Sequence, residues 1–382
     1  MKNNSQSKWP IIAAGAIFIA CLLAGYWLSQ RKPLWNDEIY TQVTVIDKVS
    51  YFNLLTRQNP EGNNAPLFYI IQKAVCDLTG YTFPHLWKGE SEWFYSEPRA
   101  QIILRMSSNV FMSLTIACIF YFFAKFYSGW TGLYGLVMAL STGVVWTYWV
   151  EARPYTLWVL LTTLQSLILL YMLEQNKVDQ KLWVGLSGVH FLLSLTVILS
   201  LMQIVIASAI LWLLKVKNWK KYIFLTLVPC GLCLFYYSNA PIVSYGAADF
   251  MSLIYVHIPR ERLLIGIFLI IFFIYSVRKN KKLLKVEFIY LGFTVLLFAA
   301  AYLIYMLVML KSKGTVFGPL PDRIFIHLMP TGIIAAVIFS YYLVQEAKNK
   351  IWLFWNINIL LGGLLIWQAL DTYTNVLSIR MY

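Results

Sequence analysis

Two adjacent carboxylates are the residues of this sequence best suited to chemistry. Asp37 and Glu38 follow the first long apolar run closely, in the segment Pro33–Tyr40. A carboxylate is costly to bury unpaired near lipid, and a low-dielectric environment moves a carboxyl pKa towards the range of a general base. The other interpretation is a solvated acidic pair at a helix start, where carboxylates favour the helix dipole. The spacing alone leaves both interpretations open.

A second motif, Glu151–Tyr155, places a cation where one apolar run ends and the next begins. Pro154 suits the first turn of a helix that starts there. Arg153 is close enough in sequence to Glu151 to form an ion pair at the membrane boundary. It could equally bind a phosphate group.

A third group of cations precedes and opens a late apolar run. Arg323 and His327 are one helical turn apart, so they share a face of the predicted helix. Arg323 is either a ligand for a lipid phosphate or a snorkelling anchor, and His327 by itself is more typical of helix packing. Lys313 lies in the preceding loop, where it serves an anionic ligand or is a tolerated loop charge.

Composition shows that the elements positioning these residues are membrane-spanning helices. Hydrophobic residues make up 59% of the 382 residues and charged residues only 13%, whereas a soluble domain is about half apolar and a quarter charged. Runs such as Ile11–Leu28 and Ile102–Phe123 are long enough to cross the roughly 30 Å hydrocarbon layer as helices. The sequence predicts an all-α polytopic membrane protein with about 11 transmembrane helices. The predicted spans cover residues 10–29, 102–124, 131–149, 154–173, 182–199, 200–214, 222–238, 262–277, 286–309, 324–343 and 351–370.

The distribution of basic residues predicts the orientation of the chain. With a cytoplasmic N-terminus, the inner side holds 16 of the 31 basic and four of the 17 acidic residues, which leaves 15 and 13 outside. Cytoplasmic loops carry an excess of Lys and Arg, so this partition favours that orientation. The net charge of +14 is therefore mostly a topology signal, and no nucleic-acid partner is expected.

The first outer loop covers about residues 30–101, is far longer than an ordinary connection and carries the acidic pair. Within it Pro66–Leu78 is apolar with polar interruptions and too short to span, which favours an interfacial helix. Asn64 can cap that helix, and Arg105 enters the second span shortly after the loop. No separate soluble domain is predicted, so residues 1–382 are expected to form a single transmembrane domain.

Cysteines and histidines indicate neither a disulfide framework nor a zinc site. The five cysteines are odd in number and lie mostly inside apolar runs. The CxxC spacing of Cys230 and Cys233 stands in an apolar helix with no second pair, which favours helix packing. The four histidines are scattered along the chain.

These motifs occur in an order that resembles the GT-C superfamily of membrane glycosyltransferases. A first span precedes the acidic pair, an Asn-Ala-Pro-Leu-Phe-Tyr surface helix, an arginine in span two, a Glu-Ala-Arg-Pro-Tyr turn and a late Asp-Arg-Ile-Phe segment. The order is most similar to the branch of the protein O-mannosyltransferases and lipid A aminoarabinose transferases, over the first ten predicted spans. That family often has His-Pro-Pro-Leu-Tyr-Tyr where this chain has Asn64–Tyr69, and Arg-Tyr where it has Arg323-Ile324.

The resemblance implies transfer of a sugar from a polyprenyl-phosphate donor to a hydroxyl acceptor on a protein, lipid or glycan. Asp37 would deprotonate the acceptor, and Glu38 would orient the acceptor or a neighbouring cation. The residues expected at the donor phosphate are Arg153, Arg323, Lys313 and His327. The residues expected in the substrate pocket are Asn64, Tyr155 and Arg105.

No cofactor is obligatory for this chemistry, because the leaving group is a phosphomonoester dianion, and a divalent metal is compatible with it. The compact size favours a bacterial inner membrane. The active site would then lie on the periplasmic side, in contact with membrane lipid.

A lipid-linked sugar transporter or flippase is the alternative function. Such a protein would favour charged or Gly/Pro-broken segments at mid-membrane depth, whereas His190, Gln203 and Glu287 stand near span ends or alone. A non-catalytic scaffold would not need a long outer loop organised around carboxylates. The sequence therefore favours the transferase.

Overall fold

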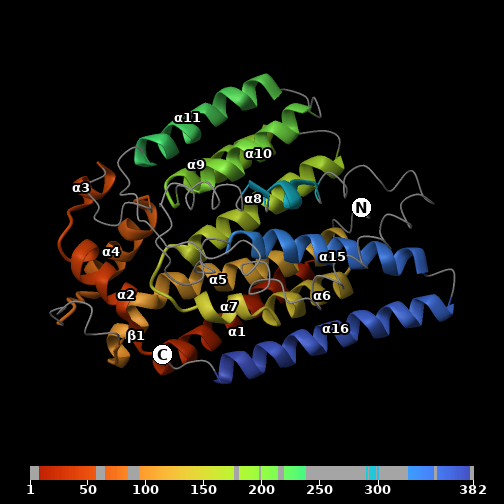
Figure 1. Cartoon of the computed structure of the whole chain (residues 1–382), viewed down its shortest axis with the longest axis horizontal. Coiled ribbons are helices and arrows are strands. Elements are labelled where there is room, and N and C mark those ends of the chain that lie inside the picture. Colours follow the sequence, from red (N-terminus) through yellow and green to blue (C-terminus); the bar gives the residue numbers. More distant parts are fainter. Residues whose placement is uncertain are drawn as a thin grey trace, which may run out of the picture. The chain divides into compact units, whose positions relative to one another are not determined.

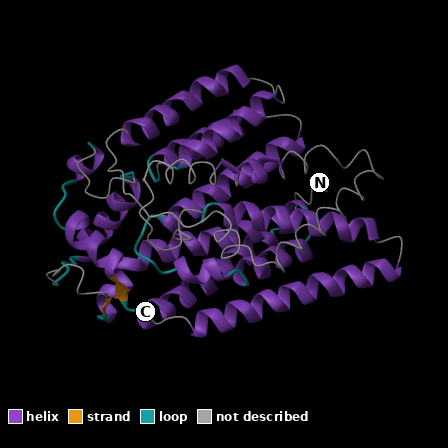
Figure 2. Cartoon of the chain, in the orientation of Figure 1, coloured by secondary structure: helices purple, strands orange, loops and turns teal. Residues whose placement is uncertain are grey.

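The structure is a computed structural model that describes residues 8–56, 65–84, 94–175, 180–197, 199–213, 219–237, 290, 292–297, 299–300, 326–347 and 351–378. The described chain is mostly helical (Figure 2) and includes a two-stranded ribbon. Its elements, in chain order, are α1 (Trp9–Arg31), β1 (Leu34–Trp35), α2 (Asn36–Thr41), the π-helix η1 (Gln42–Ile46), α3 (Tyr51–Leu55), α4 (Leu67–Thr79), β2 (Phe94–Tyr95), α5 (Pro98–Phe126), α6 (Gly129–Leu140), α7 (Gly143–Tyr148), α8 (Tyr155–Gln175), α9 (Gln180–Ser194), α10 (Ser200–Leu213), α11 (Trp219–Tyr237), α15 (Leu328–Ala347) and α16 (Ile351–Ser378).

The chain divides into two compact units. The first comprises Met1–Pro241 with Leu364–Tyr382, and the second comprises Ile242–Gly363. The predicted single domain over residues 1–382 stays a prediction. The acidic pair and the helices around it belong to the first unit.

Three helices in the described part of the chain are long and apolar enough to cross a membrane: α1, α5 and residues Tyr155–Glu174 of α8. The shorter apolar helical segments are Gly129–Leu140, Ser200–Trp212, Thr226–Tyr236, Leu328–Tyr342 and Asn358–Leu370. The predicted fold class is confirmed to this extent, as a mostly helical chain with membrane-length helices. The eleven spans stay a prediction, since residues 262–277 and most of 286–309 lie outside the described residues.

Helix α1 packs along α5, which also packs against α6 and α8 (Figure 1). In the first half of α1, Ala14 packs against Phe120 and Ala124 of α5. Near its other end, Gly25 faces Asn109 of α5, whose Nδ2 donates a 3.0 Å hydrogen bond to an α1 carbonyl oxygen. Small residues at both contacts let the two helices approach closely where hydrophobic driving force is weak.

The region predicted as one span over 131–149 is instead two helices, α6 and α7, with a break at Ser141 and Thr142. Both hydroxyl groups donate to a carbonyl oxygen in the last turn of α6, at 3.1 and 2.8 Å. The indole Nε1 of Trp146 donates to the carbonyl oxygen of Leu140 at 2.6 Å. Side chains thus satisfy carbonyl groups that a continuous helix would pair with amides, which makes the break tolerable in an apolar layer.

The polar segment between α1 and α5 begins and ends with two short strands that lie side by side. Strands β1 and β2 pair antiparallel, with Leu34 opposite Tyr95 and Trp35 opposite Phe94. The residues between the two strands are therefore closed into one loop, whose last strand leads directly into α5. This closure holds the acidic pair beside α5.

The predicted surface helix at Pro66–Leu78 corresponds to α4. Pro66 precedes its first turn, and Gly80 ends it with a φ of 60°, a left-handed conformation that glycine adopts without strain. Gln72 Nε2 donates to the Leu104 carbonyl oxygen of α5 at 2.7 Å. Helix α4 is therefore anchored to the same helix that carries Arg105.

Replacement of Gly25 by alanine should destabilise the α1–α5 contact, whereas Gly15→Ala should leave stability almost unchanged. A Cβ at Gly25 would lie 1.9 Å from Asn109 Oδ1 and 2.8 Å from Trp149 Nε1, but a Cβ at Gly15 meets nothing within 4 Å. Overpacking of this kind costs about 1–3 kcal/mol. Thermal unfolding in one detergent checks this, and an unchanged midpoint for Gly25→Ala would contradict it.

Candidate active site

The centre of the candidate site is a buried ion pair between Glu38 of α2 and Arg105 of α5. The guanidinium donates from Nε to Oε1 at 2.8 Å and from Nη2 to Oε2 at 2.5 Å, which is a bidentate, charge-assisted arrangement. Both side chains are 0% exposed. Removing two charges from water is costly unless further hydrogen bonds satisfy both partners. The remaining contacts of each side chain therefore decide what the pair does.

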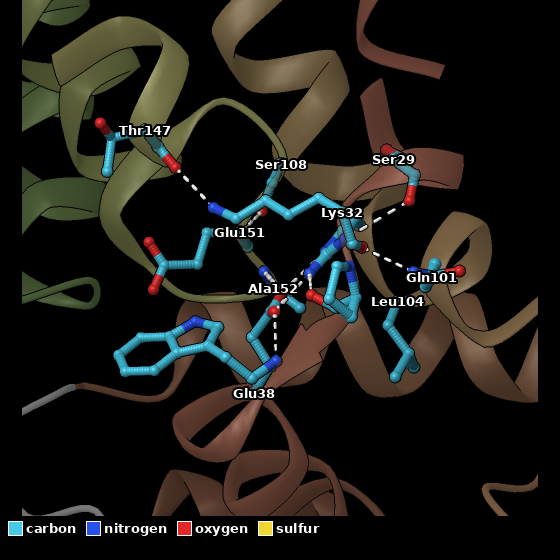
Figure 3. A network of polar contacts seen from close by, with 12 residues as sticks. Ser29, Lys32, Glu38, Gln101, Leu104, Ser108, Thr147, Glu151 and Ala152 are labelled. Atoms are coloured by element: carbon cyan, nitrogen blue, oxygen red, sulfur yellow. Dashed lines mark hydrogen bonds and ion pairs between the residues drawn. The ribbon is translucent and has the colours of Figure 1, made fainter. Parts of the chain in front are cut away.

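The other N–H groups of Arg105 are directed at carbonyl groups at the end of α1, around Ser29 and Lys32, which Figure 3 labels. Nη1 donates to the carbonyl oxygens of Ser29 and Lys32, and Nη2 donates to that of Pro33 at 2.7 Å. The last carbonyl groups of a helix have no partner within it, and they attract a cation. Together with the two bonds to Glu38, these contacts match the five N–H donors of a guanidinium.

Glu38 is also fully hydrogen-bonded. In addition to Arg105, Oε1 accepts from the Ala152 amide at 2.7 Å and Oε2 accepts from the Trp35 amide at 3.2 Å. The bond to Trp35 closes the first turn of α2 as a capping interaction. With protein donors on both oxygens and no exposed surface, Glu38 holds the site together and orients Arg105.

The turn between α7 and α8 is fixed by two further hydrogen bonds, one at the end of α7 and one beside the Ala152 amide (Figure 3). Lys32 Nζ donates to the Thr147 carbonyl oxygen at 3.0 Å. Ser108 Oγ of α5 donates to the Glu151 carbonyl oxygen at 2.6 Å. These bonds immobilise the backbone just before the next cation of the site.

Asp37 is in a different environment from its neighbour. Its side chain is 30% exposed, and its Oδ2 lies 3.9 Å from Nη2 of Arg153, whose side chain is 9% exposed. Nη1 of Arg153 also donates to the Asp37 carbonyl oxygen at 3.4 Å and to Thr41 Oγ1. The guanidinium lies over the Tyr155 ring, with 5.8 Å from Cζ to the ring centroid. A cation is thus held against an accessible carboxylate.

The structure brings five of the predicted site residues together: Asp37, Glu38, Arg105, Arg153 and Tyr155. Of these, Arg105 has protein acceptors for all its donors, so it contributes by positioning the site.

The other predicted residues are elsewhere. Asn64, Lys313 and Arg323 lie outside the described residues, and their assignments stay predictions. His327 is buried in the turn before α15 and belongs to the second unit, so nothing relates it here to Asp37.

Three contributors were not predicted: Lys32, Thr41 and Ser108. Thr41 lies one helical turn after Asp37, and helical spacing from the acidic pair could have indicated it. Lys32 is a basic residue on the predicted outer side, where the positive-inside rule expects fewer of them. No signal in the sequence distinguishes Ser108 from the other polar residues of α5.

Burial dominates the electrostatics of two groups near the site. It lowers the pKa of Lys32, a shift that Glu151 and Glu38 oppose and Arg105 reinforces. In η1's following turn, burial raises the pKa of Asp47, although the hydrogen bond from Gln42 opposes the shift.

A second polar cluster lies inside the bundle between α8, α9 and α10. Gln165 Nε2 is 2.8 Å from His190 Nε2 and donates to the Gln203 carbonyl oxygen at 3.3 Å. The Gln203 side chain donates to Thr162 Oγ1 at 2.9 Å and accepts from Trp158 Nε1 at 2.7 Å. His190 and Gln203, which stand apart in the sequence, are therefore joined in one buried network. Polar groups of this kind within membrane helices are expensive and often functional.

The groups available for chemistry around Asp37 are a carboxylate and a guanidinium. Within the described ranges, no cluster of three or more His, Cys, Asp or Glu side chains could hold a metal ion. The arrangement can accept a proton and stabilise an anion at adjacent positions.

Comparison of the chain with protein-family models and with curated proteins finds no match. The resemblance to the GT-C superfamily therefore rests on the motifs and their order.

Removal of the cation at the centre should be strongly destabilising. Arg105→Met leaves the Glu38 charge buried and unpaired, which costs about 3–5 kcal/mol. Arg99 of the same helix is exposed, and Arg99→Met should cost at most about 1 kcal/mol. Unfolding midpoints in detergent measure both effects.

Adding Glu38→Gln to Arg105→Met should recover part of the lost stability, because it removes the unpaired charge. If the double variant were less stable than Arg105→Met alone, the ion pair would not be the source of the effect.

Proposed function

We propose that this protein is a membrane glycosyltransferase that moves a sugar from a polyprenyl-phosphate donor to a hydroxyl acceptor on a protein, lipid or glycan. The observation that carries the proposal is the contrast within the acidic pair. Glu38 is buried against Arg105, whereas Asp37 is partly exposed beside Arg153. One carboxylate builds the site and the other is available to a substrate.

In the proposed reaction Asp37 accepts the proton of the acceptor hydroxyl while the hydroxyl oxygen attacks the anomeric carbon of the donor sugar. The new glycosidic bond forms as the bond between the anomeric carbon and the phosphate oxygen breaks. Its electron pair leaves with the polyprenyl phosphate, whose charge Arg153 stabilises. The family resemblance adds that this single displacement inverts the anomeric configuration.

A lipid donor agrees with the surroundings of the site. Arg105 and the carbonyl groups it binds lie at the end of α1, one of the membrane-length helices, and Arg153 immediately precedes α8, another. An isoprenoid tail would lie among such helices, with its phosphate at their ends. The further residues proposed for the donor phosphate are Arg323, Lys313 and His327, and those proposed for the pocket are Asn64 and Tyr155. No metal is obligatory, and a divalent ion is compatible with the reaction.

The finer architecture is part of the same proposal. It comprises about 11 spans in a single domain over residues 1–382, a GT-C-like arrangement, and a cytoplasmic N-terminus. The site then faces the outer side of a bacterial inner membrane.

A lipid-linked sugar transporter is the second candidate, and one observation favours it. The buried network of Gln165, His190 and Gln203 places polar groups among apolar helices, which is common in transport pathways. The transferase is preferred because the exposed Asp37 beside Arg153 supplies chemistry that transport does not need.

Asp37→Asn should reduce sugar transfer by about 10²–10⁴-fold, the usual contribution of a general base, because an amide cannot accept the proton. Transfer is measured in membranes supplied with a radiolabelled polyprenyl-phosphate sugar. Undiminished transfer would exclude Asp37 as the base.

Asp47→Asn is the matched control. Asp47 accepts a 2.8 Å hydrogen bond from Gln42 Nε2, which an asparagine oxygen can also accept. Its transfer rate should equal that of the parent protein at equal expression.

The transporter hypothesis predicts that function depends on the buried polar network and not on Asp37. In proteoliposomes with a lipid-linked sugar and no acceptor, Gln165→Leu would slow translocation, whereas Asp37→Asn would have no effect. Absence of translocation by the parent protein would remove this candidate.

A further inference from the structure

Lys32 is a cation of the site that the proposed reaction does not yet use. It follows the last residue of α1, and its Nζ donates to the Thr147 carbonyl oxygen at 3.0 Å. An ammonium group has three N–H donors, and within the described part of the chain Nζ makes this one hydrogen bond. The side chain is partly exposed although protein surrounds it. Lys32 can therefore still donate to a ligand.

The charged groups around Lys32 belong to three segments of the chain. Glu151 belongs to the turn before α8, Glu38 to α2 and Arg105 to α5, and all three act on its charge. Glu38 and Arg105 neutralise each other, so Glu151 is the charge that remains to face Lys32. In Figure 3 the Lys32 ammonium and the Glu151 carboxylate lie on the same side of the turn. On α1 itself, Arg31 is placed over the Trp27 ring, with 4.4 Å to the centroid.

Lys32 and Arg153 hold opposite ends of the same short turn. Lys32 binds the carbonyl group of Thr147, the neighbour of Tyr148. The Tyr148 ring packs edge-on against Tyr155, with 5.3 Å between centroids, and Arg153 lies over Tyr155. Arg153 of the turn is therefore engaged with Asp37, whereas Lys32, which is hydrogen-bonded to the other end of the turn, has spare donors.

We propose that Lys32 is a ligand of the donor phosphate, supplying the second positive charge that an isoprenyl phosphate needs in this site. The inference rests in part on the proposed function, which makes a lipid phosphate the leaving group. Arg105 has no spare donor, and Arg153 is already shared among Asp37 and Thr41. Arg153 supplies one positive charge to a phosphate dianion, and Lys32, whose charge Glu151 offsets only in part, supplies a second one together with its spare N–H donors.

The competing explanation is that Lys32 only holds the turn or anchors α1 at a lipid headgroup. A neutral amine can still donate a hydrogen bond to the Thr147 carbonyl oxygen, although a weaker one than an ammonium donates, but it would not match a phosphate charge. Binding of an anion should therefore depend on the charge of Lys32, whereas the fold should not.

The test is binding of farnesyl phosphate, a short isoprenyl monophosphate, to the purified full chain in phospholipid-free detergent, followed by tryptophan fluorescence. Farnesol is the uncharged control. Lys32→Gln should weaken farnesyl phosphate binding about tenfold or more and leave farnesol binding unchanged, and Lys32→Arg should retain it. Arg31→Gln, its neighbour on α1, should bind as the parent protein does. Equal affinities of Lys32→Gln and the parent protein would overturn the inference.

Measuring farnesyl phosphate affinity over a range of pH distinguishes the charge of Lys32 from its structural role in holding the turn. Lysine loses its positive charge as pH rises through its pKa, which burial lowers for Lys32, whereas the phosphate is already fully ionised above pH about 7. Affinity should therefore fall as pH rises above about 7 in the parent protein and stay level in Lys32→Arg, because arginine remains charged. The same decline in both proteins would overturn the inference, whatever the stability of Lys32→Gln.

Two further ligands identify the source of the phosphate. Inorganic phosphate and a short-chain phosphatidylglycerol should both bind more weakly than farnesyl phosphate. Tighter, Lys32-dependent binding of phosphatidylglycerol would show a lipid-headgroup anchor and contradict the inference.

These measurements need neither sugar nor acceptor. If Lys32-dependent binding holds while Asp37→Asn retains transfer, the proposed catalytic role fails and the binding site stands.

Discussion

The pairing of Glu38 with Arg105 is the interaction on which the rest of the site depends. One guanidinium binds the terminal carbonyl groups of α1 and the carboxylate of α2, and that carboxylate in turn binds the backbone before α8. Such a pair is stable in a water-poor setting only because each partner is hydrogen-bonded on every side. The end of α1 and the neighbouring α2 are consequently fixed relative to two distant parts of the chain, α5 and the backbone before α8.

This arrangement assigns different roles to two carboxylates that are adjacent in sequence. Successive residues of a helix point about 100° apart, so one of them can face α5 while the other faces outward. Glu38 is 1% exposed, and the side chain of Asp37 is 30% exposed. The structural pair supports a rigid α2, and a rigid α2 holds Asp37 beside Arg153. The buried Glu38–Arg105 pair and the partly exposed Asp37 beside Arg153 therefore depend on each other.

The apolar surroundings impose a second constraint, which is that every backbone group must find a partner. The break between α6 and α7 is possible because two hydroxyl groups and an indole bind the carbonyl groups that the break exposes. The end of α1 uses Arg105 and Gln101 for the same purpose, since Gln101 Nε2 donates to the Lys32 carbonyl oxygen at 2.6 Å. Several polar side chains of the described chain therefore bind backbone carbonyl groups at helix ends and breaks.

The sequence by itself determined that the protein is mostly helical with membrane-length helices, and it located the segment that carries the candidate site. Long apolar runs can only be helices in lipid, so composition was sufficient for the helical fold, and the residues around Asp37 and Arg153 were identified from their unusual place at span ends. Only the tertiary structure decided which carboxylate is buried, that Arg105 is saturated, that the helix over 131–149 is broken, and that Gln165 joins His190 to Gln203. Those outcomes depend on contacts between residues that are far apart in the sequence: Glu38 binds Arg105, 67 positions away, and Ala152, 114 positions away. Local helix or strand propensity carries no information about such contacts.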